Sequence, residues 1–457
     1  MATTGDGRRD ESRSGRLVSA VRARDADAVR ALLEEGADPD TAGEDGLPVL
    51  CAAVAAYDEP VAEALLEGGA DQDRPLPDGT TPLLRAVDLG SPAMVTALLG
   101  NEPQLRLPQS AQARLLSLAR NWYETGAAQE LRRRTGVSGP VEVVLTLDDE
   151  YKHVERVSLG GLTVRAGHGA VLTWLERSFR IPTPVAELAA RALRHPDEKH
   201  VEWFEACFAL SQRRDEEAWS AVVGLRHHPS PAHRRFAAYS LGIGVSVETT
   251  GQDWYAKARN RLLAIWAIEE TDGEVLAKVL EAYPGDDHPD QEALGLRHAN
   301  HADPRVRREV PYYLHRHGVP LSPAGTTALL ALARDPETAV RSAVCSALGA
   351  GRDLTSETRN ALLTLVRDPD SGVRAGAAVA LSSSRDRAPV VTDAFRALLD
   401  DDDRMLRLEG AYGLAQLDDP RTEEAYERVG PLGPGFEHDH RALGLWRWSR
   451  RNRPDRP

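Results

Sequence analysis

The stretch Asp-Pro-Glu-Thr-Ala-Val-Arg at 335–341 decides the fold, because it occurs three times in related form. It returns as Asp-Pro-Asp-Ser-Gly-Val-Arg at 368–374 and, with more changes, as Asp-Asp-Asp-Arg-Met-Leu-Arg at 401–407. The copies start 33 residues apart each time, at positions 335, 368 and 401. A fixed period of this length is typical of repeat proteins, in which each unit buries its apolar face against its neighbours. The sequence therefore predicts a solenoid.

Each copy lies between two segments with helical apolar spacing. In the first copy the apolar stripe after the turn consists of Val340, Ala343, Val344, Ala347 and Leu348. This spacing predicts an α-helix, and its alanines allow neighbouring helices to approach closely. A second apolar segment precedes each copy, at 327–333, 359–366 and 393–399. We therefore expect units of helix, Asp-Pro turn and helix, in which the aspartate caps the second helix and the proline stands in its first turn.

This pattern resembles the HEAT repeat, in the short form named after the phycobilisome lyases. That family carries an Asp-Pro, then a Val-Arg, then a helix of small residues, and the resemblance implies that each arginine reaches toward an aspartate of an adjacent unit. The arginines in this position are Arg307, Arg341, Arg374 and Arg407. The repeat-turn residues singled out here are Asp303, Pro304, Arg307, Asp335, Pro336, Arg341, Asp368, Pro369 and Arg374. We expect about seven HEAT-like units over residues 183–430, with the phase of 234–300 left open.

A second repeat lies nearer the N-terminus. Leu-Leu pairs recur at 32–33, 65–66 and 98–99, and the segment Asp-Gly-Thr-Thr-Pro-Leu at 78–83 resembles the ankyrin repeat. Asp-Gly permits a tight turn, and Thr-Pro can start a helix. The turn residues singled out here are Asp45, Gly46, Asp78, Gly79 and Pro82; Leu50 and Leu84 replace the histidine that this family usually has. We expect about three ankyrin repeats over residues 14–100 after a disordered tail at 1–13.

The segment 101–182 matches neither repeat. Strand-like alternation at 141–147, 151–159 and 162–165, with Gly160-Gly161 as a turn, predicts a small β-element. Helices are expected at 111–122, 127–134 and 170–179. Two interpretations remain open: a structural joint that caps both repeat blocks, or an insert specific for a partner. Residues 431–457 are expected to hold a C-terminal helix and a tail.

The charge is concentrated in the N-terminal repeats. The chain of 457 residues has a formal net charge of −14, and residues 1–100 carry 9 Arg and 19 Asp+Glu, or −10 of that total. Three scattered cysteines argue against a disulfide framework. No segment has the apolar length of a signal peptide or a membrane span, so we expect a cytoplasmic protein without membrane contact.

Motifs for chemistry are absent from the sequence. It contains no Gly-x-Ser-x-Gly, His-Glu-x-x-His, Cys-x-x-Cys or Gly-x-x-x-x-Gly-Lys. Deoxyhypusine hydroxylase, which has a similar fold, binds iron through His-Glu dipeptides, but none of the 14 histidines here is followed by Glu. Histidines cluster at His288, His298, His301, His315 and His317, and again in 437–440; we expect turns and helix ends there rather than a zinc site. We predict no catalytic residue, metal or cofactor.

Two surface features leave alternatives open. Arginines at 234–235 and 305–308 could bind DNA, but Asp+Glu outnumber Lys+Arg by 42 to 36 in residues 181–457. Ion pairs between repeats therefore fit better than a phosphate-binding field. The aromatic residues that could anchor an interface are Trp122, Tyr123, Trp174, Trp446 and Trp448.

The sequence as a whole predicts an all-α protein: ankyrin repeats plus a HEAT-like α-solenoid, with a small β-containing joint between them. Solenoids offer extended surfaces that bind without chemistry. We expect a non-catalytic scaffold or adaptor for a protein or peptide, and the acidic N-terminal block favours a basic partner. The alternatives are a HEAT-like lyase or hydroxylase-type enzyme or metal protein, and a nucleic-acid-binding protein.

Overall fold

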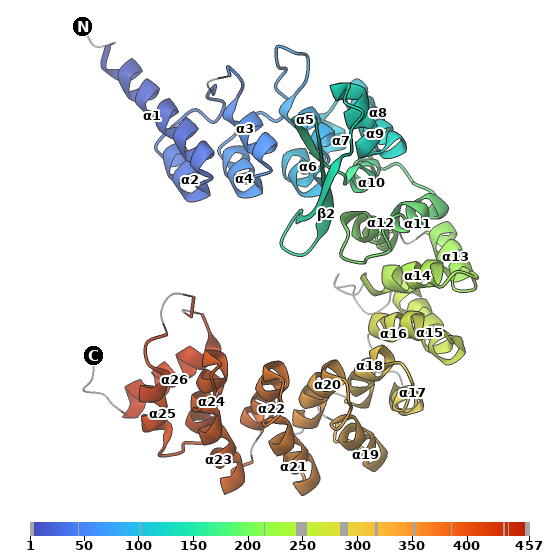
Figure 1. Ribbon diagram of the computed structural model, residues 1–457, viewed down its shortest axis with the longest axis vertical. Helices are drawn as coiled ribbons and strands as arrows, with labels where there is room; N and C mark the ends of the chain where they lie inside the picture. The colour runs from blue at the N-terminus through green and yellow to red at the C-terminus, as the bar shows by residue number, and fades with distance from the viewer. Residues whose placement is uncertain are drawn as a thin grey trace. The chain divides into compact units, whose positions relative to one another are not determined.

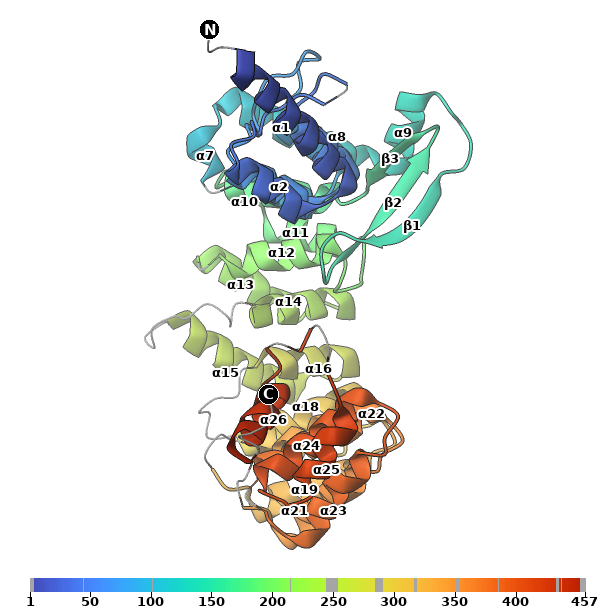
Figure 2. The same ribbon diagram turned by 90° about the vertical axis from the view of Figure 1, so that its left-hand side faces the viewer.

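The chain forms two compact units, Met1–Val247 and Glu248–Pro457, in a computed structural model (Figures 1 and 2). The structure describes residues 4–43, 45–100, 102–213, 215–243, 254–283, 291–315, 319–350, 353–384, 386–432, 435–436 and 438–452, with side chains from residue 13 onward. No helix of this described part is long and apolar enough to cross a lipid bilayer.

The first unit begins with three pairs of antiparallel helices (Figure 1). They are α1 (Thr4–Ala23), α2 (Ala26–Glu34), α3 (Val49–Ala56), α4 (Glu59–Glu67), α5 (Pro82–Leu89) and α6 (Pro92–Leu99), followed by the short α7 (Pro103–Arg106). Side-chain caps fix several starts: Asp25, Asp58, Thr81 and Ser91 each accept a hydrogen bond from a backbone N–H in the first turn. The apolar faces of these helices form one continuous core.

The N-terminal tail differs from the expectation of disorder, because α1 already begins at Thr4. The buried part of α1 starts at Leu17 and continues through Ala20 and Val21. Once that packed segment has formed the costly first turn, each further residue can extend the helix toward the N-terminus at little cost. The polar composition of residues 4–13 therefore did not predict their backbone.

A three-stranded antiparallel sheet follows two helices, as the alternation of the sequence predicts. The elements are α8 (Gln109–Thr125), α9 (Ala127–Thr135), β1 (Glu142–Leu147), β2 (His153–Leu159), β3 (Leu162–Arg165) and α10 (His168–Ser178). The strand order is β1-β2-β3, and Val143 stands opposite Val157. Gly160 and Gly161 make the β2–β3 turn with positive φ angles of 58° and 83°, which glycine adopts at little cost.

The sheet packs into the first unit through β2 and β3. Val157, Leu159 and Val164 contact Trp122 and Leu131 of α8 and α9. On the other side, Val154 packs with Ala170 of α10 and with Val201. By contrast, β1 is an edge strand whose Val143, Leu145 and Leu147 remain 54%, 59% and 59% exposed. β2 and β3 thus fit the joint interpretation, and β1 leaves an apolar edge open.

Two HEAT-like helix pairs belong to the first unit rather than to the second. These pairs are α11 (Val185–Ala192) with α12 (Val201–Ser211), and α13 (Glu216–Leu225) with α14 (Pro231–Ile243). The fully buried Arg191 of α11 donates hydrogen bonds to Glu176 and Thr173 of α10, which ties these helices to the joint. The division between units therefore falls at 247/248, inside the predicted 183–430 block.

The second unit continues the helix pairs. It contains α15 (Trp254–Glu269), α16 (Gly273–Ala282), α17 (Gln291–His298), α18 (Pro304–Leu314), α19 (Pro323–Leu332), α20 (Thr338–Gly349), α21 (Ser356–Leu365), α22 (Ser371–Ser383), α23 (Pro389–Leu398), α24 (Arg404–Gln416), α25 (Thr422–Val429) and α26 (His440–Asn452). The bounds of α14 to α17 show where the helices begin and end in residues 234–300, which the sequence left open. The sequence also suggests loop insertions at 245–253 and 283–289, and apart from Tyr283 these lie outside the described residues.

Small residues set the spacing between successive second helices. A Cβ on Gly349 of α20 would lie 2.5 Å from the Cβ of Ala380 in α22, closer than real Cβ contacts. Gly413 of α24 similarly holds its backbone against the ring of Phe395. A larger side chain at Gly349 would push α20 away from α22 of the next repeat, and one at Gly413 would push α24 away from α23 of its own repeat, so the small residues of the pattern are a packing requirement.

Candidate functional site

Three successive repeats of the second unit are joined to the next repeat by an arginine that binds an aspartate. The Nε and Nη2 atoms of Arg341 donate to Asp368 at 2.7 and 3.0 Å, and its Nη1 donates to the backbone carbonyls of its own turn, Asp335 and Pro336. The same bidentate arrangement, hereafter the arginine ladder, joins Arg307 to Asp335, Arg341 to Asp368, and Arg374 to Asp401. Arg407 holds its own turn in the same way.

The ladder aspartates act differently from the helix caps that the sequence predicts. Asp335 and Asp368 accept the backbone N–H two residues further on, and the N-cap positions are Glu337 and Asp370. Pro336 and Pro369 therefore precede their helices. The expected arrangement holds at α18, where Asp303 caps the helix and Pro304 stands in its first turn. The difference is one of register: Asp303 precedes Val306 by three residues, as the N-caps Glu337 and Asp370 precede their valines, whereas Asp335 and Asp368 precede the same valines by five.

Charge pairing lowers the pKa of the ladder carboxyls. The hydrogen bond from Arg341 lowers the pKa of Asp368 below its ordinary value. At Asp335 and Asp401 burial opposes ionisation, but hydrogen bonds from the arginine and from a backbone N–H outweigh it and lower the pKa. The ladder is thus a row of ionised contacts that hold adjacent repeats in register.

The N-terminal turn residues form tight Asp-Gly loops. Asp78 accepts from the backbone and hydroxyl of Thr80 at 2.9 and 2.6 Å, and these bonds lower its pKa to about 2. Asp45 accepts from the backbone of Leu47. Gly46 and Gly79 have positive φ angles of 75° and 77°, and Pro82 starts α5 behind the Thr81 cap.

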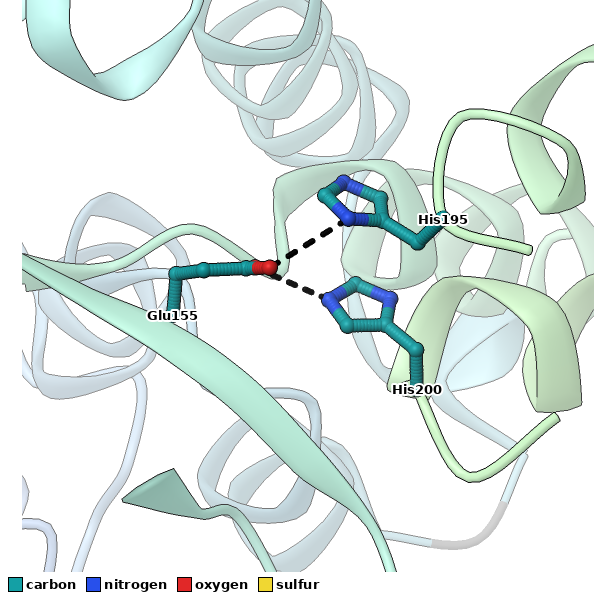
Figure 3. A group of neighbouring side chains, drawn as sticks. All are labelled: Glu155, His195 and His200. Carbon is teal, nitrogen blue, oxygen red and sulfur yellow. Dashed lines mark hydrogen bonds and ion pairs between the residues drawn. The ribbon is translucent and has the colours of Figure 1, made fainter. Parts of the chain in front are cut away.

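A cluster of histidines and carboxylates lies where β2 meets the first HEAT-like pair (Figure 3). Glu155 of β2 points toward His195, in the α11–α12 loop, and His200, the N-cap of α12, with N–O distances of 3.3 and 3.0 Å. The two imidazole rings stack with centroids 3.8 Å apart. Nearby, the backbone N–H of His153 donates to Lys199 O at 3.0 Å, so main-chain pairing continues from the sheet to this loop.

The ionisation of this cluster follows from its contacts. Hydrogen bonds from His195 and then His200 hold the pKa of Glu155 far below its usual range. Burial disfavours the His195 cation, but its hydrogen bond to Glu155 and the nearby Glu202 raise the pKa above the ordinary value. Burial raises the pKa of Glu202, which is almost fully enclosed.

Comparisons with known protein families find the same two kinds of repeat. The description "Ankyrin repeats (3 copies)" matches residues 17–107, and the description "HEAT repeats" matches residues 326–415. Residues 17–107 are ankyrin repeats, and residues 326–415 are HEAT repeats. No curated protein matches the chain.

Two solved structures are similar to the chain. The Escherichia coli protein YibA shares 15% identity, with 58% of this chain and 92% of that chain covered and a TM-score of 0.45. An engineered protein also shares 15% identity, with 96% and 97% covered and a TM-score of 0.39. Likeness at this level says nothing about function.

The described ankyrin repeats expose more carboxylates than cations. Their exposed acidic residues are Asp25, Asp27, Glu34, Glu35, Asp38, Asp45, Glu63, Glu67, Asp71 and Asp78. Five arginines of the same segment lie in ion pairs within the fold: Arg16, Arg24, Arg30, Arg74 and Arg85. The surface is therefore anionic after the internal pairs are formed.

The histidines singled out by clustering in the sequence lie in turns. His298 is buried with Nε2 3.1 Å from Ala267 O, and His301 Nδ1 accepts from the backbone of Asp303. His288, His317 and Glu437 lie outside the described residues. The sequence alone does not bring Glu155, His195 and His200 together, because Glu155 is distant in the chain; the short spacing of His195 and His200 is the one signal that it offers.

Most of the aromatic and basic residues that the sequence suggested as binding residues are held within the fold. Trp122 is buried, donates from Nε1 to Asp88 at 2.8 Å and stacks on His168, so it belongs to the joint. Trp448 is buried, whereas Trp446 is 53% exposed. Among the arginines for which DNA binding was the alternative, Arg305 and Arg308 pair with carboxylates and Arg307 belongs to the ladder.

Proposed function

We propose that the chain is a non-catalytic cytoplasmic scaffold or adaptor that binds a protein or peptide through its repeat surfaces, and that its ankyrin block takes a basic partner. The observation that carries the proposal is the anionic surface of the described ankyrin repeats. Repeat blocks present extended surfaces. A cluster of one charge sign accelerates encounter with a partner of the opposite sign.

Contacts of the HEAT-repeat arginines favour a protein partner over a nucleic acid. Phosphate binding depends on clustered cations that are available to the ligand. Here Arg307, Arg341 and Arg374 are held by aspartates of adjacent repeats. Their guanidinium groups thus serve the fold rather than a phosphate backbone.

Affinity capture from the native cell with the full-length protein tests this function. We expect a stoichiometric protein partner that is retained at low salt and released as ionic strength rises toward the physiological range, where the Debye length falls to about 8 Å. The double variant Glu34→Lys/Glu63→Lys should lose that partner, because it reverses two exposed charges of α2 and α4.

A matched control is Glu424→Lys/Glu427→Lys, which makes the same change of charge on α25 of the other unit. We expect this control to retain the partner. Equal loss from both variants, or capture that salt does not affect, contradicts the assignment to the ankyrin block. Capture of nucleic acid in place of protein contradicts the function as a whole.

A further inference from the structure

We infer that Glu155, His195 and His200 form a binding site for one divalent transition-metal ion of the zinc class. They are the sole set of three or more potential ligands found close together in the described part of the chain, with their ligand atoms all within 4.8 Å of one another. The three come from different elements: a strand, a loop and a helix N-cap (Figure 3). The fold of the joint, rather than a local motif, brings them together.

The spacing of the ligand atoms suits a small ion. Zinc bonds to imidazole and carboxylate are about 2.0–2.2 Å long, so two ligand atoms of a tetrahedral site lie roughly 3.3–3.5 Å apart. The two nitrogens lie 3.3 and 3.0 Å from the oxygens of Glu155. The carboxylate therefore has to shift only slightly for an ion to lie between these atoms, and the remaining adjustment is made by the two rings.

A buried carboxylate behind His195 supplies the outer contact that such a site needs. Histidines that bind metals usually donate their other ring N–H to a carboxylate or carbonyl, which fixes the ring and raises its basicity. Oε2 of Glu202 lies 3.7 Å from His195 Nε2, and among the described residues it is buried without a hydrogen-bond partner. The other oxygen of Glu202 is fixed by the backbone N–H of Gly169 at 3.0 Å.

Binding moves protons and turns rings. His200 Nδ1 accepts the backbone N–H of Glu202 at 3.2 Å, which places the proton of the neutral ring on Nε2, facing Glu155. An ion at Nε2 requires this proton to shift to Nδ1. Because a protonated Nδ1 cannot accept a hydrogen bond, the bond from the backbone N–H of Glu202 is then given up. The stacked rings must also tilt apart, which is easy because the terminal torsion of histidine is broad.

The donor set determines the class of ion. Two imidazoles and one carboxylate suit zinc and similar borderline cations, whereas calcium and magnesium prefer oxygen ligands alone. Glu155 and His195 remain 26% and 31% exposed, while His200 is 2% exposed. The ion can enter from the open side, and water can complete its coordination.

Cobalt titration of the full-length protein, stripped with EDTA, tests the site. We expect visible absorption bands that saturate at about one Co²⁺ per chain and are abolished by one equivalent of Zn²⁺. Glu155→Gln and His195→Ala should weaken binding at least about tenfold. Glu202→Gln should weaken it by roughly 10–100-fold, the range found for outer contacts of metal ligands.

The control is His228→Gln, which disrupts another histidine pair, His228 and His233, stacked at the same 3.8 Å. We expect this variant to bind cobalt as the wild type does. Circular dichroism without metal identifies any variant that fails to fold, and the wild-type titration does not depend on the variants. Absence of a saturable one-to-one cobalt spectrum, or equal affinity in wild type and Glu155→Gln, overturns the inference.

Discussion

Replacing Arg341 by alanine removes the central contact of the arginine ladder. The side chain makes two hydrogen bonds to Asp368 of the next repeat and two to carbonyls of its own turn. The side chains of Arg341 and Asp368 are 14% and 7% exposed, so the variant leaves a largely buried carboxylate without its cation. Among the described residues, the backbone N–H of Asp370 still donates a hydrogen bond to Asp368.

The expected loss of stability is about 2–3 kcal/mol. Breaking a fully buried ion pair costs about 3–5 kcal/mol, and partial access of water to this pair reduces the cost. The second unit spans 248–457, or 210 residues. For a unit of that size each kcal/mol lowers the Tm by roughly 2–4 °C, so we expect a shift of about 4–12 °C.

Thermal and urea unfolding followed by circular dichroism measure this loss. Arg367→Ala is the matched control, because Arg367 is exposed and has no side-chain hydrogen bond among the described residues; its effect should stay within about 0.5 kcal/mol. Arg341→Lys should fall between the two, since lysine keeps the charge but lacks the bidentate fork. If Arg341→Ala unfolds at the same temperature as Arg367→Ala, the ladder does not stabilise the repeats.

Three further results are expected. The ladder aspartates have lowered pKa values in the folded state, so their contribution to the free energy of unfolding is present above about pH 3.9, the unfolded pKa, and is lost as pH falls below it. Urea midpoints measured between pH 6 and 3 should therefore fall less for Arg341→Ala than for wild type. Parallel curves for the two proteins would refute this. Gly90→Ala should destabilise the first unit by about 2 kcal/mol more than Gly136→Ala. Both glycines have a similar positive φ, but only an alanine at position 90 would place its Cβ 2.1 Å from Arg165 O. Equal thermal shifts of the two variants would contradict this packing. Trp448→Ala should cost about 2–4 kcal/mol and the exposed Trp446→Ala less than about 0.5, as urea unfolding can show; similar losses would mean that both rings serve the fold.

The repeats could be predicted because their information is local. A turn, a capping residue and an apolar stripe recur within each unit, and the strands around Gly160-Gly161 follow the same short-range logic. The ladder followed from the resemblance to a family. Its cap geometry did not, because α20 and α22 begin two residues further along the chain than the Asp-Pro dipeptide suggested.

The cluster of Glu155, His195 and His200 could not be predicted, because the information that brings these residues together is not local. Glu155 reaches its histidines 40 and 45 residues further along the chain, and no period or motif spans that distance. The end of the first unit was equally hidden, because α11 to α14 carry the HEAT-like pattern and yet belong to the same compact unit as the joint. Long-range packing, rather than the repeat, settles both features.

The position of the cluster connects the two proposals physically. β2 carries Glu155 on a strand packed against α8 and α9, whereas His195 and His200 lie in the loop between α11 and α12, the first HEAT-like pair. An ion bound to all three would cross-link the sheet to α12 beside the backbone bond from His153 to Lys199. Since a ligand that binds only the folded form stabilises it by mass action, the metal would strengthen the first unit, which also contains the acidic ankyrin surface. The scaffold function does not require the ion, because the charged surface lies on α2, α4 and the Asp-Gly turns, apart from these three ligands.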